Sequence, residues 1–245
     1  MIKRLIRPLV HKLPYIKTLR NIINQHHQDI SRVLFKFLSD RELSDSEMLI
    51  FLELKYGGYV NNITSKIGNK IMKNHTGGDR FNPFYNDYSK MYSEYLHNLK
   101  NSKIKLLEVG ILKGTGLAVW SQYFNDVDIY GFDWDLGNIN ANLDNLISLR
   151  AFQKNKPKLF QYNQLINNQQ WLKENFTNIK FNVIIDDALH SDNAIINTFN
   201  EIQPYLSDDF VYFIEDNTSA FKKLEKKYPE YHFDNEGKLT VVTKK

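Results

Sequence analysis

The sequence contains no cysteine, only 11 glycines and no long apolar run. Without cysteine the chain can form no disulfide bond, no thiolate metal site and no cysteine nucleophile, which agrees with a reducing compartment. No stretch approaches the roughly eighteen consecutive apolar residues of a membrane-spanning helix. We therefore expect a cytoplasmic protein, and its 245 residues are enough to bury a substantial core.

Charge of either sign is also modest. The formal net charge is +4, and no RNA-recognition signature with interleaved aromatic residues is present. We therefore expect no nucleic-acid partner. The composition, with 42% hydrophobic and 24% charged residues, is typical of a globular protein.

The N-terminal segment is strongly basic, because several basic residues precede its first acidic residue, Asp29. Apolar residues recur there at helical spacing, but Pro8 and Pro14 interrupt them, and no cleavable signal peptide is expected. One interpretation is a basic amphipathic segment that makes peripheral contact with an anionic membrane surface, at the inner membrane face. The other, which we favour, is helices that pack on the domain with a solvated basic face. The basic residues are Lys3, Arg4, Arg7, Lys12, Lys17 and Arg20.

The chain changes character near residue 100. Before it we expect a helical N-terminal extension and lid over residues 1–100, with a polar loop from Asn61 to Asn82 and an aromatic helix from Phe84 to Leu99. After it, over residues 101–245, short apolar runs alternate with helical patterns, which is typical of βαβ units. We therefore predict an α/β fold with a Rossmann-like, doubly wound, mostly parallel sheet. The expected strands are 104–109, 129–132, 158–162, 182–185, 210–214 and 239–243, and the expected helices 117–124, 169–176, 194–206 and 220–228.

The first predicted strand ends in an acidic, glycine-rich turn that starts at Glu108. Gly110, Gly114 and Gly116 allow a tight turn and the close approach of a ligand. Their spacing is not the G-x-G-x-x-G of dinucleotide sites, which disfavours a nicotinamide-dependent oxidoreductase. The next strand delivers Asp133 about twenty residues on, where an acid can bind both hydroxyls of a ribose. Alone, Asp133 could equally cap a helix.

Acidic pairs follow two later strands, Asp186 with Asp187 and Glu215 with Asp216. Neighbouring parallel strands present their carboxyl ends to one crevice, where these carboxylates would repel one another unless a cation joined them. Oxygen ligands favour Mg²⁺, with Mn²⁺ or Ca²⁺ as alternatives. His190 is close enough in sequence to act as a general base. The alternative is a helix N-terminus with capping acids and a surface histidine.

The glycine-rich turn followed by Asp133 resembles the cofactor site of class I S-adenosylmethionine methyltransferases. The resemblance implies that Glu108 and the turn from Gly110 to Gly116 hold the methionine end and that Asp133 holds the ribose. Asn163 stands where the family usually has an acid near the adenine amine. Asp186 is counted with this cofactor site, although the sequence leaves open whether Asp186 or Asp187 faces a metal.

The motifs I-I-D-D-x-x-H and I-E-D are similar to those of metal-dependent O-methyltransferases that act on macrolide sugars and rhamnosyl groups, and of cephalosporin-hydroxylase-like proteins. This resemblance covers about residues 77–245 and includes an aromatic entry segment with Tyr85. It implies Mg²⁺ on Asp187, Glu215 and Asp216. Thr218 replaces a histidine that members often carry, so His190 would have to substitute for it.

These patterns together favour an O-methyltransferase that uses S-adenosylmethionine and Mg²⁺ to methylate a sugar hydroxyl of a glycan or glycosylated small molecule. Asp187 and His190 would be its catalytic residues. A catechol acceptor and a homo-oligomer both stay open. The alternative from another class is a non-catalytic binding or assembly subunit that retains the fold, and Thr218 supports it.

Overall fold

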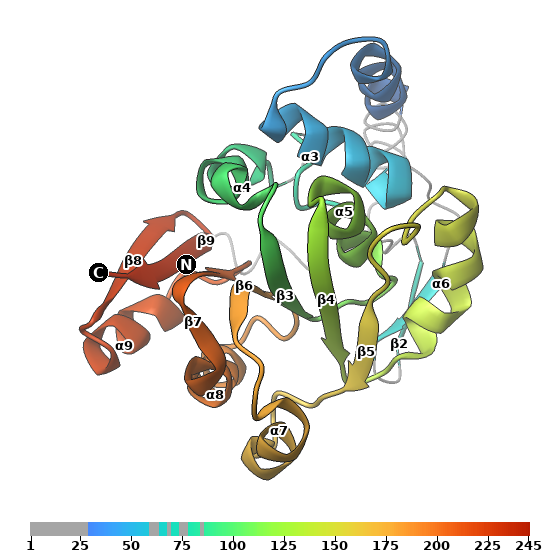
Figure 1. Ribbon diagram of the computed structural model, residues 1–245. Helices are drawn as coiled ribbons and strands as arrows, with labels where there is room; N and C mark the ends of the chain where they lie inside the picture. Colours follow the sequence, from blue (N-terminus) through green and yellow to red (C-terminus); the bar gives the residue numbers. More distant parts are fainter. Residues whose placement is uncertain (1–28, 59–63, 68–69, 74–77, 84–85) are drawn as a thin grey trace, which may run out of the picture.

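The computed structural model describes residues 29–58, 64–67, 70–73, 78–83 and 86–245 (Figure 1). Residues 1–28 of the basic segment, and Tyr85, lie outside the described residues. The centre of the molecule is a seven-stranded sheet in the order β5-β4-β3-β6-β7-β9-β8. Its strands are β3 (Lys103–Val109), β4 (Asp126–Asp133), β5 (Lys158–Gln161), β6 (Phe181–Asp186), β7 (Leu206–Ile214), β8 (Tyr231–Glu236) and β9 (Leu239–Lys244).

The strand order places one switch point at the middle of the sheet. Strands β3, β4 and β5 progress to one side, and the chain then returns so that β6 pairs with the other side of β3. The pairs from β5 to β7 are parallel, whereas β9 runs antiparallel to both β7 and β8. In such sheets the crevice for a ligand opens at the carboxyl ends of the strands where the order reverses.

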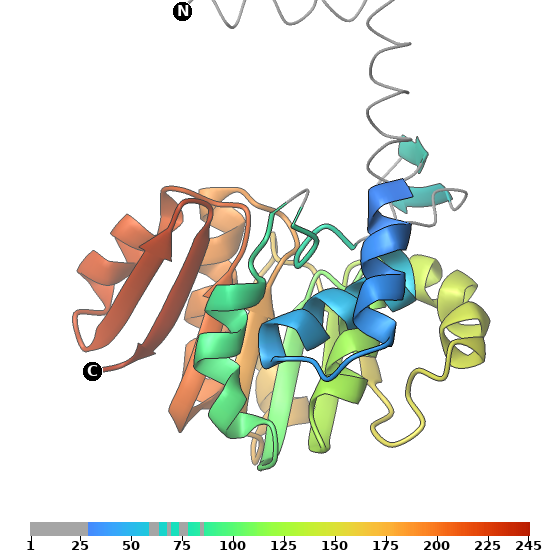
Figure 2. The same ribbon diagram turned by 90° about the horizontal axis from the view of Figure 1, so that it is seen from above.

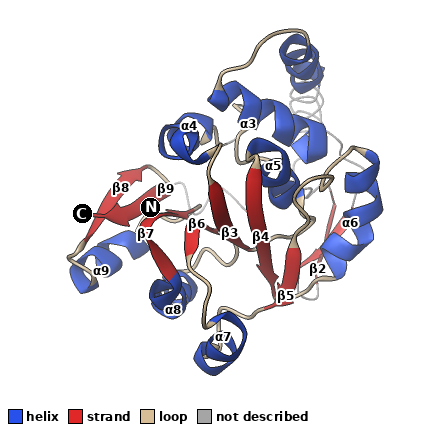
Figure 3. Ribbon diagram, viewed as in Figure 1, coloured by secondary structure: helices blue, strands red, loops and turns tan. Residues whose placement is uncertain are grey.

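Helices cover both faces of this sheet (Figures 1 and 3). Successive residues of a buried strand serve opposite faces, so Leu106 packs in one apolar cluster and Leu107 in the other. The first cluster lies under α3 (Asp45–Glu53), α4 (Ser89–Leu96), α5 (Thr115–Tyr123) and α6 (Gly137–Ser148). The second lies under α7 (Gln169–Phe176), α8 (Asp192–Ile202) and α9 (Ala220–Lys227). The expected Rossmann-like, doubly wound fold is confirmed.

The described part before residue 100 contains helices, a small hairpin and irregular segments, one of which carries Arg80. Residues 29–39 are helical, and Ser44 and Glu47 form a capping box at the start of α3. A π-helical turn, Leu54–Gly58, ends α3, and a short 3-10 turn, His97–Leu99, follows α4. The segment expected as a loop contains the two-stranded hairpin of β1 (Thr64–Ile67) and β2 (Lys70–Lys73), so that expectation was wrong in part. Within the described ranges, the helices are too short or too polar to cross a bilayer.

The sequence patterns missed two elements of the main domain. Helix α6 has four asparagines in its twelve residues, and the low helix propensity of Asn hides the buried Ile139, Asn142 and Leu146 on one side. Strand β8 is the exposed edge of the sheet, next to β9 (Figure 2). Its polar sequence, Y-H-F-D-N-E, gives a weak strand signal.

Candidate functional site

One cavity of about 730 Å³ opens at the carboxyl ends of β3, β4, β6 and β7, beside the switch point. This volume lies within the usual range for small-molecule sites, about 300–1,000 Å³. The structure brings most of the expected site residues to this one cavity, with Gly114 and Asp186 as the exceptions. Those that line it are Glu108, Gly110, Gly116, Asp133, Asn163, Asp187, His190, Glu215 and Asp216.

Asp186 faces away from the cavity lining. Its buried carboxylate accepts a hydrogen bond from Gln164 Nε2 at 2.8 Å and lies 3.5 Å from the hydroxyl of Tyr212. Burial raises the pKa of Asp186 to about 7. The next residue, Asp187, lines the cavity, as the alternation of side chains along an extended segment requires. Of the two acids, Asp187 is therefore the one that can meet a ligand.

The glycines of the turn make room for the protein's own atoms. A Cβ at Gly110 would overlap the backbone of Asp187, and one at Gly116 would overlap the carboxylate of Glu108. Gly114 precedes α5 with a φ of 77°, a left-handed conformation that favours glycine. The glycine-rich turn thus lets Glu108 lie directly under the first turn of α5.

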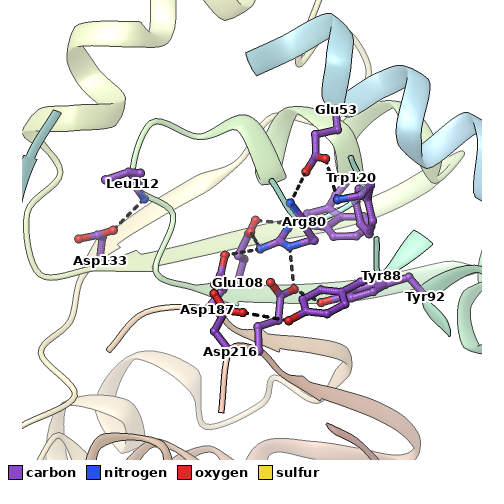
Figure 4. Close-up of polar contacts among 12 residues, drawn as sticks. Glu53, Arg80, Tyr88, Tyr92, Glu108, Leu112, Trp120, Asp133, Asp187 and Asp216 are labelled. Carbon is purple, nitrogen blue, oxygen red and sulfur yellow. Dashed lines mark hydrogen bonds and ion pairs between the residues drawn. The ribbon is translucent and has the colours of Figure 1, made fainter. Parts of the chain in front are cut away.

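Asp133 anchors this turn from the end of β4. Its Oδ2 accepts the backbone N–H of Leu112 at 2.9 Å (Figure 4). Its Oδ1 accepts the backbone N–H of Asp135 at 3.1 Å. Burial raises the pKa of Asp133, although these hydrogen bonds act in the opposite direction. Each carboxylate oxygen still has a second lone pair, so Asp133 can accept hydrogen bonds from ligand hydroxyls as well.

Arg80 lies at the centre of the acidic part of the cavity, and the sequence analysis did not single it out. Its Nη2 donates to Glu108 Oε1 at 2.7 Å and to Asp187 Oδ2 at 2.9 Å, and its Nε lies 2.7 Å from Glu215 Oε1 (Figure 4). The Arg80 side chain is only 7% exposed. One guanidinium therefore joins carboxylates that follow or end three different strands.

The charges of this cluster are strongly coupled. Burial alone would lower the pKa of Arg80, but the carboxylates of Glu215 and Glu108 hold it well above the ordinary value. Burial raises the pKa of Asp187 and of Glu215 to about 8, and Arg80 opposes both shifts. Arg80 is therefore a permanent cation, whereas Asp187 and Glu215 gain protons more readily than ordinary acids.

The three expected metal ligands do not converge on a common point. Asp187 and Glu215 contact Arg80, while Asp216, at a φ of 52°, accepts the hydroxyl hydrogen of Tyr88 at 2.9 Å. Tyr92 also donates to Glu215. In the part of the chain that the structure describes, no three His, Asp or Glu side chains form a group that could hold a metal ion. While Arg80 lies among them, these residues do not fit Mg²⁺, and the magnesium ion stays a prediction.

Two expected polar residues lie on the open side of the cavity. His190 is exposed and lines it, and the side-chain Oδ1 of Asn163 accepts the backbone N–H of Leu165 at 2.9 Å. Thr218 is also exposed but is not among the described residues that line the cavity. The position expected to hold a histidine in related proteins therefore does not face the cavity here, whereas His190 does.

Lys113 is a second cavity residue that the sequence analysis missed. Within the described ranges, its Nζ is buried and has no hydrogen-bond partner. Burial lowers its pKa. Lys113 immediately precedes the N-terminus of α5, whose backbone N–H groups favour an anion. The only sequence signal was its place inside the glycine-rich turn.

Comparison with solved structures identifies similar folds. The methyltransferase MycE of the mycinamycin biosynthetic pathway, solved with Mg and S-adenosylhomocysteine (SAH), is 17% identical at a TM-score of 0.54. A second MycE structure, in complex with Mg, SAH and mycinamycin VI, gives the same values. The O-methyltransferase TomG from Streptomyces achromogenes, in complex with S-adenosylmethionine, is 13% identical at a TM-score of 0.49 and covers 63% of this chain and 79% of TomG. No protein-family model and no curated protein matches the sequence.

The MycE alignments cover 67% of this chain and 51% of MycE, so the chain corresponds to about half the length of that protein. Together with the strand order, they show that this chain has the Rossmann-like fold found in S-adenosylmethionine-dependent methyltransferases.

Proposed function

We propose that this protein is an S-adenosylmethionine-dependent O-methyltransferase. The observation that carries the proposal is the single cavity at the switch point. The cavity is lined by the glycine-rich turn and Asp133, and also by His190 and Asp187. The MycE structure, solved with SAH, supports a cofactor of this class.

The residues of the cavity suit the parts of this cofactor. Asp133 would accept hydrogen bonds from the ribose hydroxyls, and the Asn163 carbonyl would accept one from the adenine amine. Glu108 would face the ammonium of the methionine end. Lys113 and the N-terminus of α5 would face its carboxylate, which gives the buried Nζ of Lys113 the partner that it lacks among the described residues.

The cofactor, when bound, supplies a methyl group on a cationic sulfonium, ready for direct in-line transfer. In this reaction an acceptor hydroxyl must lose its proton. His190, exposed to the cavity, would accept that proton, since an imidazole does so near neutral pH. Asp187, held by Arg80, would accept a hydrogen bond from the acceptor and orient it. No step is assigned to a metal ion.

A sugar hydroxyl is the acceptor that we favour. The cavity is also lined by Asp187, Asp216 and His190, groups that bind hydroxyls by hydrogen bonds. MycE has been solved with mycinamycin VI, which supports an acceptor of this kind. Contact of the basic N-terminus with a membrane, a lid role for residues 1–100 and a homo-oligomer stay predictions.

Calorimetric titration with SAH, with and without Mg²⁺, tests the cofactor site. We expect micromolar binding by the wild type and a loss of at least about tenfold in Asp133→Ala, because a charge-assisted pair of hydrogen bonds disappears. Asp144→Ala, on the exposed side of α6, is the matched control and should bind like the wild type. Absence of binding by the folded wild type under both conditions would overturn the proposal.

Thr218 supports one alternative, a binding or assembly subunit that retains the fold without catalysis. If this alternative holds, the protein should bind SAH but transfer no methyl group to any acceptor in a panel of sugars, glycosides and catechols. The panel is read with S-adenosylmethionine labelled in the methyl group. Transfer that is lost in His190→Asn, with SAH affinity unchanged, would exclude the alternative.

A further inference from the structure

Arg80 occupies the place in the acidic site where a cation was expected from the sequence. Its guanidinium contacts Glu108, Asp187 and Glu215 at 2.7 to 2.9 Å. Two of these acids belong to the set expected to hold a divalent ion. Each of the three acids contacts the guanidinium through one carboxylate oxygen, so the charge that a metal would neutralise already has a partner.

The backbone and the neighbouring rings fix this guanidinium in position. Glu53 on α3 accepts the backbone N–H groups of Arg80 at 3.1 Å and of Phe81 at 2.6 Å. The guanidinium carbon lies 5.6 Å from the ring centroid of Trp120, within the range of a cation–π contact. Trp120 also donates to the second oxygen of Glu108, at 3.2 Å. Arg80 is therefore held from its backbone to its tip.

A divalent ion and this guanidinium exclude one another. Mg²⁺ requires nearly octahedral oxygen ligands at about 2.0–2.1 Å, which would bring the carboxylates of Asp187 and Glu215 together around one point. Those oxygens instead surround the nitrogens of Arg80. The remaining acid, Asp216, is bonded to Tyr88 and lies 3.8 Å from the ammonium of Lys238.

We propose that Arg80 is the resident cation of this carboxylate cluster and keeps divalent metal ions from Asp187 and Glu215. The inference concerns the acidic site alone and does not depend on methyl transfer. Its consequence is a metal-independent protein whose metal site is latent, because removal of one side chain would expose the ligands.

The test is binding of Mn²⁺, followed by loss of the electron paramagnetic resonance signal of the hydrated ion. We expect the wild type to bind Mn²⁺ weakly and Arg80→Gln to bind one equivalent at least about tenfold more tightly, because the freed carboxylates then lack a counterion. The double variant Arg80→Gln/Asp187→Asn should lose this gain. Arg41→Gln, which removes an exposed partner of Glu47, is the matched control and should behave like the wild type.

Two results would overturn the proposal. One is a wild-type protein that binds Mn²⁺ with micromolar affinity and loses it in Asp187→Asn. The other is a neutral Arg80 variant that gains neither Mn²⁺ binding nor thermal stability from Mn²⁺. An Arg80 variant that folds only with Mn²⁺ present supports the proposal, since the ion then replaces the missing cation. SAH affinity, measured in parallel, reports separately on the cofactor site.

Discussion

The carboxylate of Glu53, buried on α3, accepts the backbone N–H of Arg80 at 3.1 Å. The same carboxylate accepts the N–H of Phe81, so one side chain of the N-terminal part holds the segment that carries Arg80. We expect Glu53→Ala to lower the free energy of unfolding by about 2–4 kcal/mol, because two buried donors lose their acceptor. Denaturant unfolding measures this change. Glu42→Ala, at an exposed position, should change it by less than about 0.5 kcal/mol.

Stability should fall as the pH rises from about 4 to about 8. Burial raises the pKa of Glu53, Asp187 and Glu215 to about 8, above the ordinary values of 4.5 for Glu and 3.8 for Asp. The folded state thus holds these protons more tightly than the unfolded state, and the free energy of unfolding declines as pH rises from about 4 to about 8. Calorimetric melting across this window should show a decreasing Tm, with a shallower slope in Glu215→Gln. A Tm that increases across the window would contradict the raised pKa values.

Replacing Gly116 or Gly237 by alanine should destabilise the protein for two different reasons. Gly116→Ala should destabilise the protein by about 1–3 kcal/mol, because the new Cβ meets the carboxylate of Glu108. Gly237→Ala has open space around it and only a left-handed φ of 61°, so about 1 kcal/mol is expected. SAH titration should show weaker binding for Gly116→Ala alone. Equal affinity in both variants would show that Glu108 and the turn do not contact the cofactor.

Lys113 offers a second test of the cofactor site. Lys113→Met keeps the apolar stem but removes the buried ammonium, and we expect the SAH dissociation constant to rise about tenfold, the typical worth of one charge-assisted hydrogen bond. Lys154→Met, at an exposed position, is the control. Without ligand, the variant should be at least as stable as the wild type. The substitution removes a buried cation that has no hydrogen-bond partner among the described residues. An unchanged SAH dissociation constant would show that Lys113 does not contact the cofactor.

His190 is expected to act on the rate alone. With an acceptor that the wild type methylates, His190→Asn should lower kcat by about a hundredfold or more, the usual contribution of a general base. SAH affinity should stay the same, because the proposed role of His190 is to take the proton of the acceptor and not to contact SAH. Thr218→His should not restore the rate, since residue 218 is outside the cavity lining. Full activity in His190→Asn would show that another group acts as the general base.

The features that could be predicted from the sequence are those with a local signal. Apolar runs followed by acids marked β3, β4, β6 and β7, and the ends of these strands do meet at one cavity. The same alternation of faces that places Leu107 opposite Leu106 decides between Asp186 and Asp187, but it requires knowing where β6 ends. That end is set by tertiary pairing with β3 and β7.

Arg80 had no such signal. It lies in a polar stretch, and its partners Glu108 and Asp187 are 28 and 107 residues away along the chain. Nothing in the spacing of a single sequence reports contacts at such separations. Glu53 gave no signal for a similar reason. A glutamate at the end of a helix is ordinarily solvated, whereas here α3 packs against α4 and α5 and Glu53 is buried.

The order of these charges along the chain has a consequence for synthesis. Arg80 is translated before Glu108, Asp187 and Glu215, so the positive partner is already present on the nascent chain when each acid leaves the ribosome. A domain generally folds as a unit during synthesis. Whenever the sheet forms, the guanidinium is therefore already available to the three carboxylates, and no acid has to be buried before its cation has been made.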